Sequence, residues 1–235
     1  MKTEFDIIGF DADDTLWINQ PNYDDAENEF CKLLSNYINP EALSKELYIT
    51  EMQNLSLYGY GAKSFMLSMI ETAIRITKKE VTQIIINDII TLGKKLINRP
   101  ITLLNGVKEV LEFFNGTGIK IILVTKGDLI DQKRKLHNSK LEKFFHHIEI
   151  MSDKKESDYL KLLSHLNVES ERFLMIGNSL KSDIIPVLNI GGFGIHIPYH
   201  TNWQHDYVDK IEKHSNLIEV ENIAKIIKLF RGKNK

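Results

Sequence analysis

The sequence predicts an α/β protein with a core of parallel strands and an inserted helical domain. Five short runs of apolar and β-branched residues recur along the chain, and helical patterns separate the last four. Strands that alternate with helices of this size form βαβ units, which build a parallel sheet. A long segment that is helical throughout interrupts this alternation after the first run. Right-handed crossovers place the carboxyl ends of all the strands along one edge, where residues of the following loops are expected to meet.

Hydrophobic periodicity places the elements of the core. The strands are expected at Phe5–Phe10, Lys120–Thr125, Ile148–Met151, Phe173–Ile176 and Gly194–Ile197, with a short sixth run at Leu217–Val220. The core helices are expected at Gly106–Asn115, Leu129–Ser139, Ser157–Leu166, Ser182–Asn189 and Glu221–Arg231.

The helical interruption reads as four amphipathic helices, because apolar residues recur at i, i+3 and i+4 spacing. Pro21 and Pro100 flank this segment as punctuation. We therefore expect two domains, a core of residues 1–20 and 98–235 and a helical cap of residues 21–97 over the sheet edge. The four helices are expected at Asp24–Tyr37, Pro40–Asn54, Ala62–Thr77 and Thr82–Ile97.

Composition excludes several classes of protein. The chain has 30 basic and 32 acidic residues, and this net charge of −2 gives no electrostatic reason to expect a nucleic-acid partner. Cys31 is the only cysteine, so no intrachain disulfide can form. No apolar run approaches the roughly 18–20 residues of a membrane span, and the N-terminus lacks the pattern of a signal peptide. We expect a cytoplasmic protein without membrane or nucleic-acid partners, and its oligomeric state stays open.

An acidic cluster follows the first apolar run. Asp11, Asp13 and Asp14 crowd one buried strand end, where like charges raise carboxylate pKa values unless a cation compensates. A divalent metal would resolve this, with Asp11 and either the backbone or the side chain of Asp13 as hard oxygen ligands. A solvated turn is the simpler alternative. A calcium loop is excluded, because its sixth and twelfth positions hold Leu16 and Asn22 instead of Gly and Glu.

Two further strand ends carry residues suited to a phosphate group. Thr125 ends the second strand and Lys126 follows it, so a hydroxyl and free backbone amides can meet a phosphate oxygen there. Alternatively, Thr125 caps a turn. Lys154 follows the third strand and would bring a cation to the same edge, although the neighbouring Lys155 is a rival for this role.

The fourth strand is followed by the run GNSLKSD, which ends in Asp183. Asp183 can return toward the sheet edge and supply a further oxygen to a metal, and Asn178 can hold a metal-bound water through its amide oxygen. The alternative is that Ser182 or Asp183 serves as a helix N-cap, worth about 1 kcal/mol. That alternative does not explain why suitable residues also follow the other strands.

Taken together, these residues at the ends of four predicted strands resemble the four motifs of the haloacid dehalogenase-like superfamily. The resemblance implies a Rossmann-like core with the Asp11 strand in the middle and a helical cap after the first motif. It also implies Mg²⁺ between Asp11, Asp183 and the backbone carbonyl of Asp13. In this reading Asp11 is the nucleophile and Asp13 the general acid–base. Thr125 binds the transferring phosphoryl group, while Lys154 orients and neutralises it. Lys126, next in the chain, is a further candidate contact for the substrate. The matching residues are Asp11-Ala12-Asp13-Asp14-Thr15-Leu16, Thr125, Lys154 and Gly177-Asn178-Ser179-Leu180-Lys181-Ser182-Asp183.

The resemblance points to a Mg²⁺-dependent phosphatase acting on a small organic phosphate through an aspartyl-phosphate. Dehalogenases of the family lack an acid two residues after the nucleophile, so Asp13 favours phosphoester chemistry. Asn178 departs from the family pattern, since many relatives have Asp there, and metal affinity is expected to be weaker. A phosphomutase of the same superfamily and a non-catalytic binding module remain alternatives.

The expected cap contributes two candidate substrate contacts. Tyr60 and Lys63 lie in or beside a glycine-containing turn between two predicted helices, from which they could reach the leaving group of the substrate. An ordinary interhelix turn with solvated side chains is the alternative. Trp17 is expected to be a packing residue.

Overall fold

The computed structural model describes residues 5–201, 203–204, 208 and 213–231. The chain forms two compact units. One comprises Met1–Gln20, Ile101–Lys126 and Arg134–Lys235, and the other comprises Pro21–Pro100 with Gly127–Lys133. Among the described residues, no helix is both long and apolar enough to cross a bilayer.

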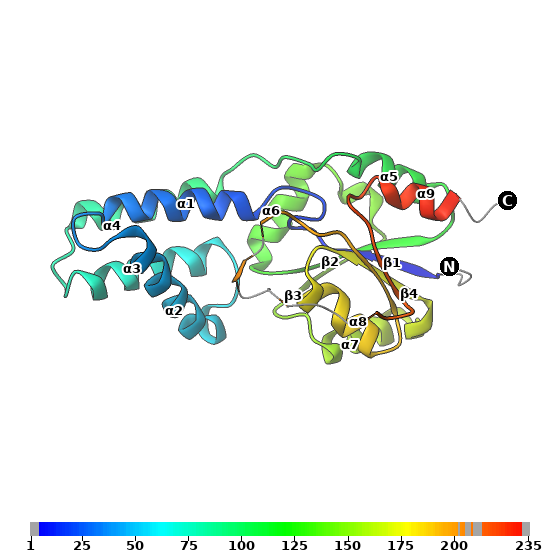
Figure 1. Cartoon of the computed structure of the whole chain (residues 1–235). Helices are drawn as coiled ribbons and strands as arrows, with labels where there is room; N and C mark the ends of the chain where they lie inside the picture. The colour runs from blue at the N-terminus through cyan, green and yellow to red at the C-terminus, as the bar shows by residue number, and fades with distance from the viewer. Residues whose placement is uncertain (1–4, 202, 205–207, 209–212, 232–235) are drawn as a thin grey trace. The chain divides into compact units, whose positions relative to one another are not determined.

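The described strands of the first unit form one six-stranded parallel sheet in the order β3-β2-β1-β4-β5-β6. This order confirms the predicted Rossmann-like α/β fold, with the first strand in the middle of the sheet (Figure 1). Phe10 of β1 lies opposite Leu123 of β2 on one side and Ile176 of β4 on the other. The strands are β1 (Ile7–Phe10), β2 (Lys120–Lys126), β3 (His147–Met151), β4 (Phe173–Gly177), β5 (Phe193–His196) and β6 (Leu217–Glu219).

Helices cover both faces of the sheet because side chains alternate along each strand. Ile8 and Phe10 pack into one apolar cluster with α5 and α9, whereas Ile7 packs into another with α7 and α8. Figure 1 shows these two helix pairs on opposite sides of the strands. The helices that lie after residue 100 in the chain are α5 (Val107–Asn115), α6 (Leu129–Ser139), α7 (Glu156–Leu166), α8 (Ile185–Asn189) and α9 (Lys225–Arg231). Shorter turns are η1 (Glu142–Phe144), η2 (Ser170–Arg172) and η3 (Leu180–Ile184).

The second unit has its own apolar core, made by helices that lie between β1 and β2 in the chain. Phe30, Leu43, Met69 and Ile89 represent the four helices in this core, and all four side chains are fully buried. The helical insertion predicted from periodicity is therefore present, while its role as a cap remains a prediction. The helices are α1 (Gln20–Leu33), α2 (Pro40–Tyr58), α3 (Ala62–Ile76) and α4 (Gln83–Ile97).

The limits of α1 were predicted wrongly. The helix begins at Gln20 instead of Asp24, because the Asp14 carboxylate accepts hydrogen bonds from the amides of Asn19 and Gln20 at 2.8 and 2.9 Å. Pro21 fits the first turn, where its missing N–H costs nothing. The helix ends at Leu33, four residues before the predicted end.

The helix predicted at Ser182–Asn189 was also wrong in its form. The chain makes a wide π-helical turn over Leu180–Ile184 and then a short helix over Ile185–Asn189. Pro186 has no amide hydrogen to donate to the Ser182 carbonyl four residues earlier. The buried Tyr159 hydroxyl of α7 donates to that carbonyl at 3.0 Å.

Candidate active site

The carboxyl edge of the sheet gathers four of the predicted residues in buried positions. Asp11 follows β1, and its amide donates to the Ile176 carbonyl of β4 at 2.9 Å, which fixes its backbone at the edge. Thr125 lies at the end of the adjacent β2, while Lys154 and Asp183 follow β3 and β4. The exposed fractions of these side chains lie between 1% and 6%, so they face the protein interior and not bulk water.

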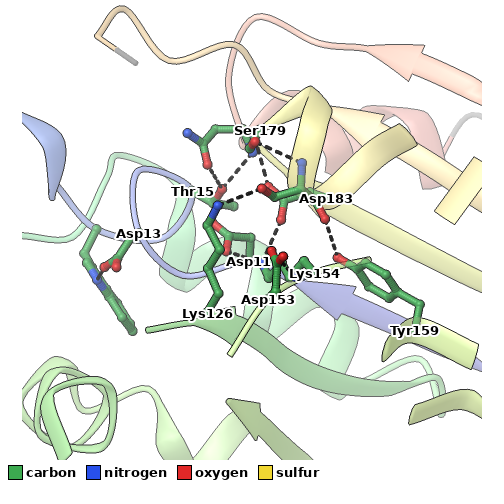
Figure 2. Close-up of polar contacts among 12 residues, drawn as sticks. Asp11, Asp13, Thr15, Lys126, Asp153, Lys154, Tyr159, Ser179 and Asp183 are labelled. Carbon is green, nitrogen blue, oxygen red and sulfur yellow. Dashed lines mark hydrogen bonds and ion pairs between the residues drawn. The ribbon is translucent and has the colours of Figure 1, made fainter. Parts of the chain in front are cut away.

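Lys154 joins the two carboxylates of the site. Its Nζ atom lies 2.6 Å from Asp11 Oδ1 and 2.7 Å from Asp183 Oδ1. Figure 2 draws Lys154 together with these two carboxylates. Lys155, the rival in the sequence, has an exposed side chain and pairs with Asp153. The geometry therefore favours Lys154 as the lysine of this site.

Burial governs the electrostatics of this cluster. Burial and the neighbouring Asp183 carboxylate raise the pKa of Asp11 to about 7, although the Lys154 ammonium opposes the shift. Burial alone would lower the pKa of Lys154, but Asp11 and Asp183 raise it above its ordinary value. Lys154 is therefore a cation, and the two carboxylates beside it leave an excess of negative charge when both are ionised.

A glycine and a local hydrogen-bond loop place Asp183. The Asp183 carboxylate accepts from the Ser179 amide at 2.9 Å, and the Asp183 amide donates to the Ser179 carbonyl at the same distance. Ser179 is the N-cap here, because its hydroxyl accepts from the Ser182 amide at 3.1 Å. A Cβ atom on Gly177 would lie 2.5 Å from Asp183 Cγ, so only glycine lets this carboxylate return to the strand end.

The Asn178 side-chain amide lies beside oxygen atoms of Asp11 and Asp13. Its terminal atom lies 3.1 Å from the Asp13 backbone carbonyl and 3.3 Å from Asp11 Oδ2. With nitrogen in that position the amide donates to both oxygens. With oxygen there, three oxygen atoms face one another, an arrangement that a cation stabilises. Thr15 holds this loop, since its hydroxyl accepts a hydrogen bond from the Asn178 backbone N–H at 3.0 Å.

These donors fit a hard divalent cation. Within the described part of the chain, no group of three or more His, Cys, Asp or Glu side chains is arranged to hold a metal ion. The oxygen set here is of a different kind, with two carboxylates, one backbone carbonyl and one amide. Oxygen ligands and excess negative charge are what Mg²⁺ requires.

The Asp13 side chain turns to other partners, so of the two options only the backbone carbonyl faces the proposed metal site. Its carboxylate accepts from the Trp17 indole nitrogen at 2.6 Å and from Lys135 Nζ at 3.0 Å. Sequence reasoning missed Lys135 and treated Trp17 only as a packing residue. Helix α6 carries few apolar residues, so periodicity gave little signal that Lys135 faces this loop.

The other predicted substrate residues are placed as follows. Lys126 Nζ lies 2.8 Å from the Ser182 hydroxyl, which links the end of β2 to the η3 turn. Lys63 forms an ion pair with Asp128 at 2.7 Å inside the second unit. Tyr60 lies in the loop between α2 and α3. Contact of Tyr60 and Lys63 with a substrate remains a prediction.

His196 is a further residue that sequence reasoning missed. One ring nitrogen lies 3.0 Å from the Asn178 carbonyl and the other lies 3.0 Å from Glu219. The ring therefore supports the backbone of the Asn178 loop from β5. Only the pairing of β4 with β5 reveals this contact, and no short motif contains both residues.

Comparison with known proteins identifies the family. Residues 5–191 match the family described as haloacid dehalogenase-like hydrolase. The chain belongs to this family. A haloacid dehalogenase-like family hydrolase from Xanthomonas campestris is similar in structure, with 36% sequence identity and a TM-score of 0.86 over 98% of this chain and 92% of that one.

Two phosphatases are also similar to the chain. The glyceraldehyde 3-phosphate phosphatase of Pyrococcus abyssi is 26% identical over 136 residues, which span 55% of this chain and 57% of that protein. A predicted phosphoglycolate phosphatase from Haemophilus somnus shares the fold, with a TM-score of 0.63 and 17% identity over 98% of this chain and all of that one.

Proposed function

We propose that this hydrolase is a Mg²⁺-dependent phosphatase that cleaves small organic phosphate monoesters through an aspartyl-phosphate on Asp11. The observation that carries the proposal is the buried Lys154 ammonium between Asp11 and Asp183, at 2.6 and 2.7 Å. A carboxylate nucleophile and a phosphate are both anions, so their approach requires cations that are already in place.

The reaction has two steps. An Asp11 carboxylate oxygen attacks phosphorus, the bond between phosphorus and the leaving oxygen breaks, and Asp13 gives its proton to that oxygen. Water then attacks the phosphorus of the aspartyl-phosphate while Asp13 takes a proton from the water. The bond between phosphorus and Asp11 breaks, which releases inorganic phosphate and restores the carboxylate.

The residues around Asp11 have separate tasks in this scheme. Lys154 holds one Asp11 oxygen and supplies positive charge beside the phosphoryl group. Thr125 and Lys126, at the end of β2, bind phosphoryl oxygens through hydroxyl, amide and ammonium hydrogens. Asp11 and Lys154 are buried, so their charges act in a medium of low dielectric constant. Each charge therefore contributes more to the interaction energy there than it would in water.

The metal has a defined place in the proposal. Asp11, Asp183, the Asp13 backbone carbonyl and the Asn178 amide oxygen would hold Mg²⁺. When bound, Mg²⁺ supplies further positive charge against the phosphoryl oxygens. Asn178 contributes an oxygen without a charge, so the proposed affinity is lower than with a third carboxylate.

A three-carbon phosphate is the first substrate to test. The similarity to a glyceraldehyde 3-phosphate phosphatase supports this choice, although it covers little more than half of that protein. A phosphomutase would return the phosphoryl group to a sugar, and a binding module would turn over nothing. The release of inorganic phosphate distinguishes a phosphatase from both of these alternatives.

The deciding experiment compares wild-type protein with Asp11→Asn. A panel of phosphorylated three- to six-carbon metabolites is incubated with Mg²⁺, and phosphate release is measured. The amide is a poor nucleophile, so we expect Asp11→Asn to lower kcat by roughly 10⁴-fold or more. Acid quenching of the wild-type reaction should trap a phosphorylated peptide that contains Asp11.

Asp88→Asn is the matched control, because Asp88 is exposed on α4. It should retain wild-type phosphate release. Undiminished turnover by Asp11→Asn would contradict the nucleophile assignment. An isomerised sugar phosphate without phosphate release would replace the phosphatase proposal with a mutase.

A further inference from the structure

Lys135 is directed at the loop that carries the proposed acid–base residue. From α6 its Nζ atom lies 3.0 Å from both Asp13 carboxylate oxygens and 2.8 Å from the Asn19 side-chain oxygen. The side chains of Lys135 and Asp13 are only 14% and 22% exposed. All three residues belong to the first unit. An ammonium has three hydrogens to donate, and here three oxygen atoms surround it.

Trp17 holds the same carboxylate from a second direction. Its indole nitrogen donates to Asp13 Oδ1 at 2.6 Å, and the ring is fully buried. The Trp17 backbone is fixed as well, since its carbonyl accepts from the Asp14 amide at 2.8 Å. Figure 2 shows the Asp13 side chain to one side of the Asp11, Lys154 and Asp183 cluster. Lys135 and Trp17 together therefore determine where the Asp13 carboxylate lies.

We infer that Lys135 is a positioning residue for the acid–base step, fixing the Asp13 carboxylate by contact with both of its oxygens. This inference rests on the proposed phosphatase function. A carboxylate on a freely rotating bond spends little time in the geometry that proton transfer needs, and small displacements carry large losses in rate. An ordinary, partly exposed ion pair would contribute little to stability and nothing to catalysis.

The two roles differ in how they depend on the leaving group. When the phosphoryl group is transferred to Asp11, an alkoxide leaving group needs the proton of Asp13. In contrast, 4-nitrophenolate is a stable anion and leaves without that proton. The value of kcat/KM reports the steps up to this first transfer and excludes the later attack of water. A positioning defect at Asp13 therefore lowers kcat/KM for an alkyl phosphate far more than for a nitrophenyl phosphate.

Lys135→Met tests this dependence, since methionine keeps much of the stem and removes the charge. With glycerol 3-phosphate we expect kcat/KM to fall about 10²-fold, the lower range for acid–base catalysis, against less than about threefold for 4-nitrophenyl phosphate. Lys133→Met, an exposed lysine of the same helix, should leave both values unchanged. Equal losses on both substrates, or no loss on either, would overturn the inference.

A second readout does not depend on activity. The chain has two tryptophans, so indole N–H resonances can be assigned with Trp203→Phe as a reference. Lys135→Met should shift the Trp17 indole resonance, because the carboxylate bonded to it is released, and Lys133→Met should not. An unmoved Trp17 resonance would show that Lys135 does not hold Asp13. If the wild-type protein released no phosphate from either compound, the proposed function would fail, while this resonance would still decide the role of Lys135.

Discussion

At the scale of single residues, the site depends on how closely groups can approach one another. Gly177 ends β4 directly against Asp183, and any side chain there would enter the space of that carboxylate. Asp183 in turn contacts Lys154, which contacts Asp11. A single methyl group on Gly177 would therefore displace groups as far as Asp11, because these three charged groups are in direct contact and buried.

Gly177→Ala should disrupt this chain of contacts. The new Cβ would lie 2.5 Å from Asp183 Cγ, so the carboxylate must move away from Lys154. We expect phosphatase activity to fall at least about tenfold and the free energy of unfolding to fall by roughly 1–3 kcal/mol, as in other overpacked interiors. Phosphate release and urea denaturation measure the two effects.

Gly116→Ala is the matched control, since its nearest neighbour would be the Phe113 carbonyl at 3.7 Å and its φ is −91°. It should keep full activity. Equal tolerance of both substitutions would mean that the approach of Asp183 to Gly177 is not required.

Sequence reasoning reached the residues that carry a recognisable pattern and missed those that do not. Asp11 and Asp183 were predicted because each follows an apolar run at the same sheet edge. Lys135 is one of 30 basic residues, and only the folded chain shows which of them meets Asp13. The sequence could not decide between Lys154 and Lys155 for the same reason. The two residues are identical in type, and only the folded chain shows which side chain points into the site.

At the scale of elements, the π-helical turn η3 sets the position of Asp183. This turn lies between the end of β4 and the proline-containing α8, and a hydrogen bond from α7 supports it. Periodicity predicted one regular helix here, since a π-helical turn carries no periodic signal of its own. The start of α1 was missed for a related reason, because a cap from Asp14, six residues before Gln20, is invisible to local rules.

Tyr159→Phe tests whether the support from α7 matters. The substitution leaves the Ser182 carbonyl without the hydroxyl that donates to it, at a cost of about 1–3 kcal/mol in the free energy of unfolding. Because Ser182 adjoins Asp183, we also expect a loss of phosphatase activity. Chemical denaturation and steady-state kinetics at saturating Mg²⁺ measure the two effects.

Tyr37→Phe provides the comparison, since this tyrosine is 45% exposed. Its effect on stability should stay within about 0.5 kcal/mol. A Tyr159→Phe protein as stable and active as Tyr37→Phe would remove α7 from the account of η3.

At the scale of the whole molecule, the strand order explains why residues that follow different strands meet at one edge of the sheet. With β1 between β2 and β4, Asp11 lies where the connections diverge to opposite sides of the sheet. Two apolar clusters, one on each face, hold this sheet and therefore the spacing of its strand ends. The arrangement of strands was predictable because alternating strands and helices with right-handed crossovers leave few topologies.

This rigid edge leads to a prediction about the metal. Asp11 and Asp183 bring two carboxylates to one ammonium, so Mg²⁺ should bind the folded protein and not the unfolded chain. Binding to the folded state alone adds about 2.7 kcal/mol when Mg²⁺ is at 100 times its dissociation constant. For a protein of this size, that gain corresponds to a rise of about 5–10 °C in Tm. Calorimetry with Mg²⁺ or with a chelator measures it without reference to activity.

Asp183→Asn should abolish most of this gain, because it removes one of the two charged ligands, while Asp88→Asn should retain it. The comparison is made between the rises in Tm and not between absolute values, since Asp183→Asn also changes the stability of the metal-free protein. An equal rise in both variants would place the Mg²⁺ elsewhere in the molecule. No rise in the wild-type protein at millimolar Mg²⁺ would mean that Lys154 alone balances the two carboxylates, and that the oxygen atoms around Asn178 bind no cation.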